Sequence, residues 1–219
     1  MSSHHFVTDG QEPALIIANG AICNDELLGK SLEWSPFVMV LDGALQAVLD
    51  RNIAFNAVSG DFDSEPHAKQ KVDHLNHVEV YYTPDQDQTD LEKGIDICLQ
   101  KGFKDIHVLW GTGNRTDHLL ANINLIIRYQ SEVNLIFWDD FQKVYGIRSG
   151  FSKWYTKDTD ISLIPWPSCK AVNASNLVWP LQQLDLNIPG CLSTSNQVAM
   201  DGIVKIDFKE GNLIIAESL

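Results

Sequence analysis

The sequence predicts an α/β protein with an open, mostly parallel β-sheet and helices on both of its faces, followed by a small antiparallel β-sandwich. Up to about residue 140, apolar runs alternate with segments of helical spacing, and most of these runs are apolar throughout, as in strands buried on both faces. Beyond that point helical periodicity is absent, and short alternating segments are separated by turns. We therefore expect an α/β domain over residues 1–140 and a β-sandwich domain over residues 141–219.

The first domain is expected to alternate strands with helices. Short apolar runs bounded by breakers predict strands at 14–20, 36–41, 52–58, 78–82, 106–110 and 133–138. Helical spacing predicts helices at 24–32, 44–51, 65–75, 89–101 and 116–129. The clearest of these is 89–101, and a capping box is expected at its start, where Thr89 caps the backbone and Glu92 reaches back.

The second domain is expected to consist of short strands. They are predicted at 143–147, 160–164, 176–179, 191–193, 203–208 and 213–216, with Pro165 and Pro167 among the residues that interrupt the pattern. A domain of this size has a thin core of its own. We therefore expect it to pack against the first domain or against another subunit.

Composition restricts the class of protein. The net charge is −13, from 29 acidic residues against 16 Lys and Arg, which argues against a protein that coats nucleic acid or an anionic membrane. No apolar run reaches the roughly 18 residues of a membrane helix, and the first residues lack the pattern of a signal peptide. The cysteines are widely spaced without a C-x-x-C pair, which indicates neither zinc nor a disulfide framework. We expect a reduced, cytoplasmic protein.

Four polar clusters follow the predicted strands of the first domain: Asp42, Asp61 with Asp63, residues 85–90, and residues 111–117. In open parallel sheets, ligands bind outside the carboxyl ends of the strands. Four clusters at equivalent edges favour a shared crevice over four separate solvated turns.

Asp61 and Asp63 stand two residues apart directly after a strand, so an extended backbone points both carboxylates to the same side. Their mutual repulsion is relieved by a divalent cation, and hard oxygen ligands suit Mg²⁺. Gly60 leaves room for a phosphate or a metal to approach. Taken alone, the triplet fits an acidic surface turn better, because Gly, Asp and Ser all favour turns.

Two of the remaining clusters, at 85–90 and 111–117, stand at predicted helix starts. Asp90, in the first helical turn, is placed to point into the crevice beside Asp61 and Asp63, although capping and the helix dipole also explain acids there. The loop 111–118 is an expected anion site, with glycines, free backbone N–H groups and the guanidinium of Arg115. Asp117 suits a phosphate site only if a metal or a hydroxyl donor lies between, and His118 is interpreted as a hydrogen-bonding residue at the helix start.

Together these motifs resemble those of the thiamine pyrophosphokinase family. The matching elements occur in order along the chain: Asp42-Gly43, Gly60-Asp61-Phe62-Asp63-Ser64, the run 87–93, the run 113–118 with Asn122, the run 162–165, and Ser193-Thr194-Ser195-Asn196. Two positions depart from the family pattern: Ala44-Leu45 replaces Gly-Ala-Asn after Asp42, and Asn114 replaces a Gly.

The resemblance implies a nucleotide-binding α/β domain and a β-sandwich, assembled as a homodimer with active sites between subunits. It assigns Asp61, Asp63 and Asp90 to Mg²⁺, and it places Asp117 near the reacting groups. By the same resemblance, ATP is contacted by residues of the first domain, namely Asp42, Gln86, Thr89 and Arg115. In the second domain, Trp179 stacks on the thiamine ring and Ser193 and Asn196 complete that pocket; an aromatic face suits a cationic thiazolium.

The predicted function is therefore an enzyme that moves the pyrophosphoryl group of ATP onto the hydroxyl of thiamine and releases AMP. Catalysis is expected to come mostly from positioning and from neutralisation of charge by Mg²⁺ and Arg115, with Asp117 orienting or deprotonating the alcohol. Two alternatives remain open at this point. One is a Mg²⁺-dependent hydrolase of nucleoside or thiamine diphosphates, and the other is a non-catalytic ligand-binding module.

Overall fold

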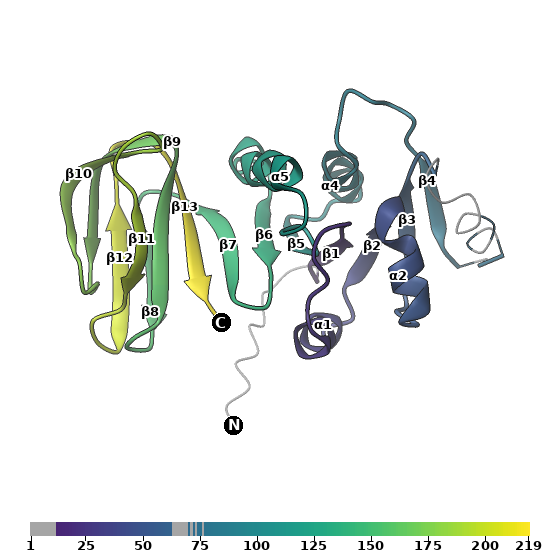
Figure 1. Ribbon diagram of the computed structural model, residues 1–219, viewed down its shortest axis with the longest axis horizontal. Helices are drawn as coiled ribbons and strands as arrows, with labels where there is room; N and C mark the ends of the chain where they lie inside the picture. The colour runs from purple at the N-terminus through teal and green to yellow at the C-terminus, as the bar shows by residue number, and fades with distance from the viewer. Residues whose placement is uncertain (1–11, 63–69, 71, 73, 76) are drawn as a thin grey trace.

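The computed structural model describes residues 12–62, 70, 72, 74–75 and 77–219 (Figure 1). Its first half is a parallel sheet in the order β4-β3-β2-β1-β5-β6. The strands are β1 (Ala14–Ile17), β2 (Phe37–Leu41), β3 (Ala57–Gly60), β4 (Glu79–Tyr82), β5 (Asp105–Leu109) and β6 (Asn134–Trp138). Strand β1 pairs with both β2 and β5, so the chain reverses its direction of winding between β1 and β5. Such a switch point opens a crevice at the carboxyl ends of the strands.

Helices cover both faces of this parallel part, as the sequence predicts. They are α1 (Asp25–Leu32), α2 (Leu45–Asp50), α4 (Asp90–Gln100) and α5 (Thr116–Arg128). Leucines of α1 and α2 pack with Leu15 and Ile17 in one core cluster, whereas α4 and α5 pack with Ile16 in another. Successive residues of β1 therefore enter opposite cores, which explains why the strand is apolar throughout.

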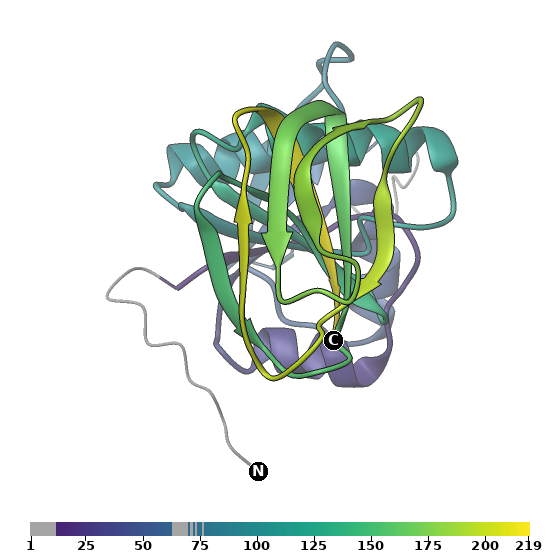
Figure 2. The same cartoon turned by 90° about the vertical axis from the view of Figure 1, so that its left-hand side faces the viewer.

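Antiparallel strands form the second half. They are β7 (Gln142–Ile147), β8 (Phe151–Tyr155), β9 (Asp160–Ser175), β10 (Leu181–Asn187), β11 (Ser193–Gln197), β12 (Gly202–Asp207) and β13 (Glu210–Ser218). From β6 the hydrogen-bonded order continues β7-β13-β9-β12-β8, and β10 and β11 also pair with β9. Figure 2 shows these strands folding over one another in front of the helices. A separate apolar cluster fills the space between them.

Several predicted elements need correction. Strand β3 begins at Ala57 and not at Asn52, because Asn52 has a φ of 51° in a turn. The predicted strand 176–179 is a turn in which only Leu177 makes a bridge, to Val198. Strands β8 and β10 were not predicted, since their polar side chains mask the alternation. The helix predicted at 65–75 lies mostly outside the described residues.

Strand β9 passes through Pro165 and Pro167, where the sequence analysis expected interruptions. The strand is held on both sides of the prolines, by pairing of Ile164 with Ile214 and of Cys169 with Gly211. The register of β13 shifts between Gly211 and Leu213, opposite this stretch. An irregular ladder tolerates residues that have no N–H to donate.

A buried polar cluster joins three strands of the second half. The Glu217 carboxylate on β13 is 1% exposed and lies 2.8 Å from the amine of Lys143 and 2.5 Å from that of Lys153. The hydroxyls of Tyr145 and Tyr155 donate to it as well. Burial acts to raise the pKa of Glu217, but these hydrogen bonds outweigh it and lower the pKa below its ordinary value. The cluster therefore ties β7 and β8 to β13.

All four cysteines are free thiols, in agreement with the prediction of no disulfide framework, and Cys191 is the exposed one. Within the part of the chain that the structure describes, no helix is long and apolar enough to cross a membrane.

Candidate active site

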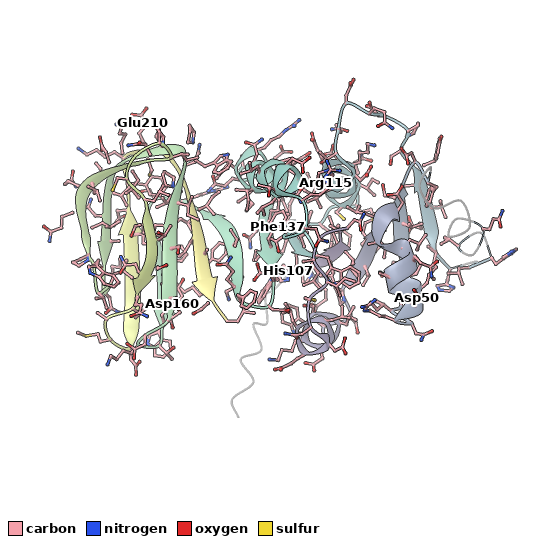
Figure 3. The ribbon with its side chains drawn as sticks, in the orientation of Figure 1. Asp50, His107, Arg115, Phe137, Asp160 and Glu210 are labelled. Atoms are coloured by element: carbon pink, nitrogen blue, oxygen red, sulfur yellow. The ribbon has the colours of Figure 1, made fainter. Side chains whose placement is uncertain are left out.

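A cavity of about 380 Å³ opens at the switch point between β1 and β5. Its walls come from the segments that follow the parallel strands, at 18–20, 41–43, 61, 86–91, 110–115 and the start of α5. Figure 3 labels Arg115 between α4 and α5, where it borders this cavity. Described residues from all four polar clusters of the sequence analysis thus line one cavity.

The floor of the cavity is held by backbone hydrogen bonds between two loops. The N–H of Gly20 donates to the carbonyl of Trp110 at 2.5 Å, and that of Ala21 donates to the carbonyl of Thr112 at 2.8 Å. A Cβ on Gly20 would lie 2.3 Å from the Trp110 carbonyl oxygen, so only glycine allows this approach. The loops after β1 and β5 therefore form a single support.

Asp42 is the buried acid of the cavity, with 6% exposure. Its carboxylate accepts hydrogen bonds from the N–H groups of Gly43 at 2.7 Å and Phe62 at 3.0 Å. A Cβ on Gly60 would lie 2.2 Å from this carboxyl group. Gly60 was predicted to leave room for a phosphate or a metal; in the structure it makes room for Asp42.

Asp61 and Asp90 line the same cavity as Asp42. Burial of Asp42 raises its pKa, and the negative charges of Asp90 and Asp61 add to that effect, while the two backbone donors oppose it. Oδ2 of Asp61 accepts a hydrogen bond from Nε2 of Gln86 at 3.1 Å. Three carboxylates thus repel one another around one space.

The described residues of the predicted magnesium site carry ligands that suit Mg²⁺. Asp63 lies outside the described residues, and among those that are described no group of three or more His, Cys, Asp or Glu side chains is close enough to share a metal ion. Asp61 and Asp90 nevertheless supply hard carboxylate oxygens to one cavity, and their repulsion favours a bound cation. The donor set fits Mg²⁺.

Lys93 is a cavity residue that was quoted as part of a motif and given no role. Its side chain is 6% exposed, and its amine donates to the Thr83 carbonyl at 3.0 Å and to Oδ1 of Asp90 at 3.3 Å. One cation thereby fixes the Asp90 carboxylate against the end of β4. In the sequence, only the three-residue spacing of Asp90 and Lys93 indicates this contact, because it places the two side chains on adjacent turns of α4.

The loop after β5, which was predicted to bind an anion, turns through the left-handed region. Gly113 and Asn114 have φ values of 74° and 55°, so both lie in the left-handed region. Asparagine tolerates this region better than most residues, which explains how Asn114 replaces a glycine there. Nδ2 of Asn122 on α5 donates to the Gly111 carbonyl at 2.8 Å and holds the loop against the helix.

Arg115, which lines the cavity, forms an exposed ion pair with Asp117. Nε of Arg115 donates to Oδ1 of Asp117 at 3.1 Å, and a second guanidinium nitrogen contacts Oδ2. These hydrogen bonds lower the pKa of Asp117 to about 2. Asp117 therefore remains a carboxylate in neutral solution and is a weak proton acceptor in this arrangement. His118, one residue further on, is exposed and borders the cavity.

Thr89 caps α4 as predicted, since its hydroxyl accepts from the N–H of Glu92 at 3.2 Å. The second half of the expected capping box is replaced by contacts of Glu92 to Gln88, which precedes α4, and to α5. The Glu92 carboxylate is 2.7 Å from Nη1 of Arg128 and accepts from Nε2 of Gln88 at 3.1 Å. Glu92 thus connects the two helices that flank the cavity.

The residues assigned to thiamine lie together in the second half. Trp179 is 59% exposed, whereas Asn196 is buried. Oδ1 of Asn196 accepts from the N–H of Trp179 at 3.1 Å and from that of Gln197 at 2.9 Å. Nδ2 donates to the Trp179 carbonyl at 2.7 Å and to the Ser193 hydroxyl at 3.3 Å. All four hydrogen-bonding positions of the Asn196 amide are thereby used to hold Trp179 and β11.

Two sequence profiles match the chain. Residues 28–137 match the thiamin pyrophosphokinase catalytic domain, and residues 151–213 match the thiamin pyrophosphokinase vitamin B1 binding domain. The chain belongs to the thiamin pyrophosphokinase family.

Relatives and solved structures agree with this assignment. The chain is 29% identical over 177 residues to thiamin pyrophosphokinase 1 of Caenorhabditis elegans, covering 72% of this chain and 69% of that protein. It is 26% identical over 203 residues to thiamine pyrophosphokinase of Bacillus subtilis, covering 88% and 92%. The crystal structure of the B. subtilis protein superposes with a TM-score of 0.80 at 24% identity, over 94% of this chain and 99% of that one. The yeast thiamin pyrophosphokinase structure gives 0.85 at 18% identity, over 97% and 87%.

In this member of the thiamin pyrophosphokinase family, the predicted site residues fall into two groups. The cavity brings together the predicted ATP and metal residues that the structure describes: Asp42, Asp61, Gln86, Thr89, Asp90 and Arg115. Trp179, Ser193 and Asn196 are not among the residues that line it. They belong to the antiparallel half, which Figure 1 shows at the opposite end of the molecule from β3 and α4.

Proposed function

We propose that this chain is a thiamine pyrophosphokinase that transfers the pyrophosphoryl group of ATP to the hydroxyl of thiamine, giving thiamine diphosphate and AMP. One observation carries the proposal: Asp42, Asp61, Asp90 and Arg115 line one cavity at the switch point of the sheet, in a chain that matches both family domains. A cavity with acids for a cation and an exposed guanidinium suits a polyphosphate.

The first domain, over residues 1–140, would bind the nucleotide. Asp61 and Asp90, with Asp63, would hold Mg²⁺, which when bound neutralises phosphate charge. Gln86, which already donates to Asp61, and Thr89, at the positive end of α4, lie beside those acids. Together with Arg115 they are the proposed contacts to ATP.

The reaction requires attack of the thiamine hydroxyl on the β-phosphorus, so that the bond to the α-phosphate oxygen breaks and AMP leaves. Phosphoryl-type transfer needs little covalent help from the protein, and positioning and charge stabilisation supply most of the catalysis. Arg115 would stabilise charge on the transferred group. Because the pKa of Asp117 is near 2, its proposed role is to accept the hydrogen bond of the attacking hydroxyl and orient it.

The second domain, over residues 141–219, would bind thiamine. The exposed indole of Trp179 offers a face for the cationic thiazolium, and Asn196 fixes the backbone that presents it. Because Trp179 is not among the residues of the catalytic cavity, we propose a homodimer in which Trp179 of one subunit serves the cavity of the other. An apolar cavity of about 490 Å³ adjoins the catalytic one through Gly113 and includes the exposed Ile22, Leu120 and Phe141, which suits such contact.

The test is chromatography of the nucleotides after incubation with ATP, Mg²⁺ and thiamine. The proposal predicts AMP and thiamine diphosphate in equal amounts, with AMP formation dependent on thiamine. Phosphate release that is independent of thiamine would support a hydrolase instead. Thiamine binding in a calorimeter without any turnover would support a binding module.

A further inference from the structure

Gln88 lies between the predicted ligands Gln86 and Thr89, and neither the motifs nor the resemblance gives it a role. It is half-buried among exposed neighbours and lines the catalytic cavity. Its side-chain amide makes two hydrogen bonds to carboxylates.

The orientation of the Gln88 amide follows from its partners. Nε2 donates one hydrogen to Oε1 of Glu92 and the other to Oδ2 of Asp96, both at 3.1 Å. Ionised carboxylates only accept hydrogen bonds, so the nitrogen of the amide must face them and the oxygen must face away. Among the described residues, no hydrogen-bond donor is assigned to Oε1 of Gln88.

The two carboxylates are themselves held by α5. Arg128 pairs with the buried Glu92 at 2.7 Å, and the Tyr129 hydroxyl donates to Oδ1 of Asp96 at 2.6 Å. Flipping Gln88 would therefore place its oxygen against two fixed carboxylates. Negative charge behind the NH₂ group also polarises the amide and strengthens Oε1 as an acceptor.

An acceptor in this cavity selects a particular part of the ligand. Phosphate oxygens are themselves acceptors, so they form no hydrogen bond with Oε1 of Gln88. The nucleoside part of ATP, in contrast, carries N–H and O–H donors. We propose that Gln88 is a nucleotide-specificity residue whose Oε1 accepts a hydrogen bond from such a donor, either the exocyclic amine of the base or a ribose hydroxyl. This inference rests on the proposed function only in taking ATP as the bound nucleotide.

Calorimetric titration of ATP with Mg²⁺ in the absence of thiamine tests the inference without turnover. Gln88→Met keeps the length of the side chain and removes the acceptor, and it should raise the Kd for ATP about three- to tenfold, as expected for a lost hydrogen bond. Gln100→Met is the matched control, because Gln100 is exposed at the other end of α4 and does not line the cavity. Its Kd should stay within about twofold of wild type.

Nucleotide analogues identify the donor. Purine riboside triphosphate lacks the exocyclic amine, and the 2′-deoxy and 3′-deoxy forms of ATP each lack one hydroxyl. The analogue that lacks the partner of Gln88 should bind wild type and Gln88→Met equally, while the others keep the difference. An unchanged Kd for ATP in Gln88→Met, or the same loss with every analogue, overturns the inference.

The inference and the proposed function fail in different ways. Thiamine-dependent AMP from the wild type, with wild-type ATP affinity in Gln88→Met, refutes only the role of Gln88. A Gln88-dependent Kd without any AMP refutes only the proposed reaction. If Gln88→Met does not fold, as judged by circular dichroism, Gln88→Asn withdraws the oxygen by one methylene and should weaken ATP binding similarly.

Discussion

Asp42, Asp61 and Asp90 bring three negative charges to a cavity that, by our proposal, binds a polyphosphate. Burial and repulsion already disfavour ionisation of Asp42 in the protein alone. A nucleotide would increase that repulsion unless cations enter with it. At the scale of the residue, our proposal therefore explains Asp61 and Asp90 by a cation that they would share, and the Lys93 amine orients Asp90.

Asp61→Asn tests this directly. The substitution keeps the hydrogen bond to Gln86 possible but removes one hard, charged ligand. The rate of thiamine-dependent AMP formation should fall by about a hundredfold or more, because charge stabilisation is lost where it acts. Asp50→Asn is the control, since Asp50 is exposed at the end of α2 (Figure 3) and should leave the rate unchanged. A near-normal rate for Asp61→Asn at saturating Mg²⁺ would refute the role of Asp61.

The location of a site residue could be predicted where it depends on the residues next to it in the sequence. Asp61, Asp90 and Arg115 follow strands or open helices, and their position at the sheet edge could be inferred from that alone. The anchoring of Gln88 could not, because it depends on Arg128 and Tyr129 of a different helix. The close approach of Gly60, at the end of β3, to Asp42, after β2, likewise depends on two separate segments.

At the scale of the element, the two halves of the chain differ in how clearly the sequence marks them. Strands β1 and β2 are buried on both faces, so their residues are apolar throughout and the prediction is close. Strand β10 exposes most of its residues, and β9 continues through two prolines. The residue types of both segments therefore do not indicate a strand over the observed range. Pairing with distant strands decides these elements, and a single sequence does not display that pairing.

Glu217 should contribute to stability in a pH-dependent way. Glu217→Gln leaves two lysines without a carboxylate, and the free energy of unfolding at pH 7 should fall by about 3 kcal/mol. The folded-state pKa of Glu217 lies below its ordinary value of 4.5, so its contribution is complete above that pH and is lost as the pH falls through the folded value. Urea unfolding of both proteins between pH 7 and pH 3 measures this. A difference that does not shrink in acid would contradict the assignment.

Asn196 should act on thiamine through Trp179. Asn196→Ala removes the four hydrogen bonds that hold Trp179 and β11, so the indole loses its fixed position. We expect the KM for thiamine to rise about tenfold while the KM for ATP changes less than about twofold. Steady-state kinetics with each substrate varied separately provides the measurement. Equal increases in both constants would indicate general loss of structure and not a thiamine-specific role.

At the scale of the whole molecule, one hydrogen-bonded sheet connects the catalytic cavity to the thiamine-binding half. The sequence analysis divided the chain at residue 140 and did not predict that strands β6 and β7, on the two sides of that boundary, pair with each other, because a single sequence does not display strand pairing. Within one chain, the antiparallel half that carries Trp179 and the parallel half that carries the cavity lie at opposite ends of this sheet (Figure 1). A site shared between subunits follows if both regions act on the same substrate.

Mixing two inactive variants tests the shared site. Asp61→Asn disables the cavity and Trp179→Ala disables the thiamine face, and each homodimer should be nearly inactive. In a mixed dimer, one site combines both defects and the other is intact. After random exchange of subunits, about a quarter of wild-type activity should return, by the rules of a two-fold symmetric assembly. No recovery, with mixed dimers demonstrated by differential tagging, would place each complete site within one chain.

The fate of the β-phosphorus tests the central proposal most directly. Wild-type protein is incubated with ATP radiolabelled at the β-phosphate, Mg²⁺ and thiamine, and the products are separated by chromatography. Attack at the β-phosphorus predicts that the label moves entirely into thiamine diphosphate, in amounts equal to unlabelled AMP. Label retained in ADP, with thiamine monophosphate as the other product, would show attack at the γ-phosphorus and contradict the proposed reaction.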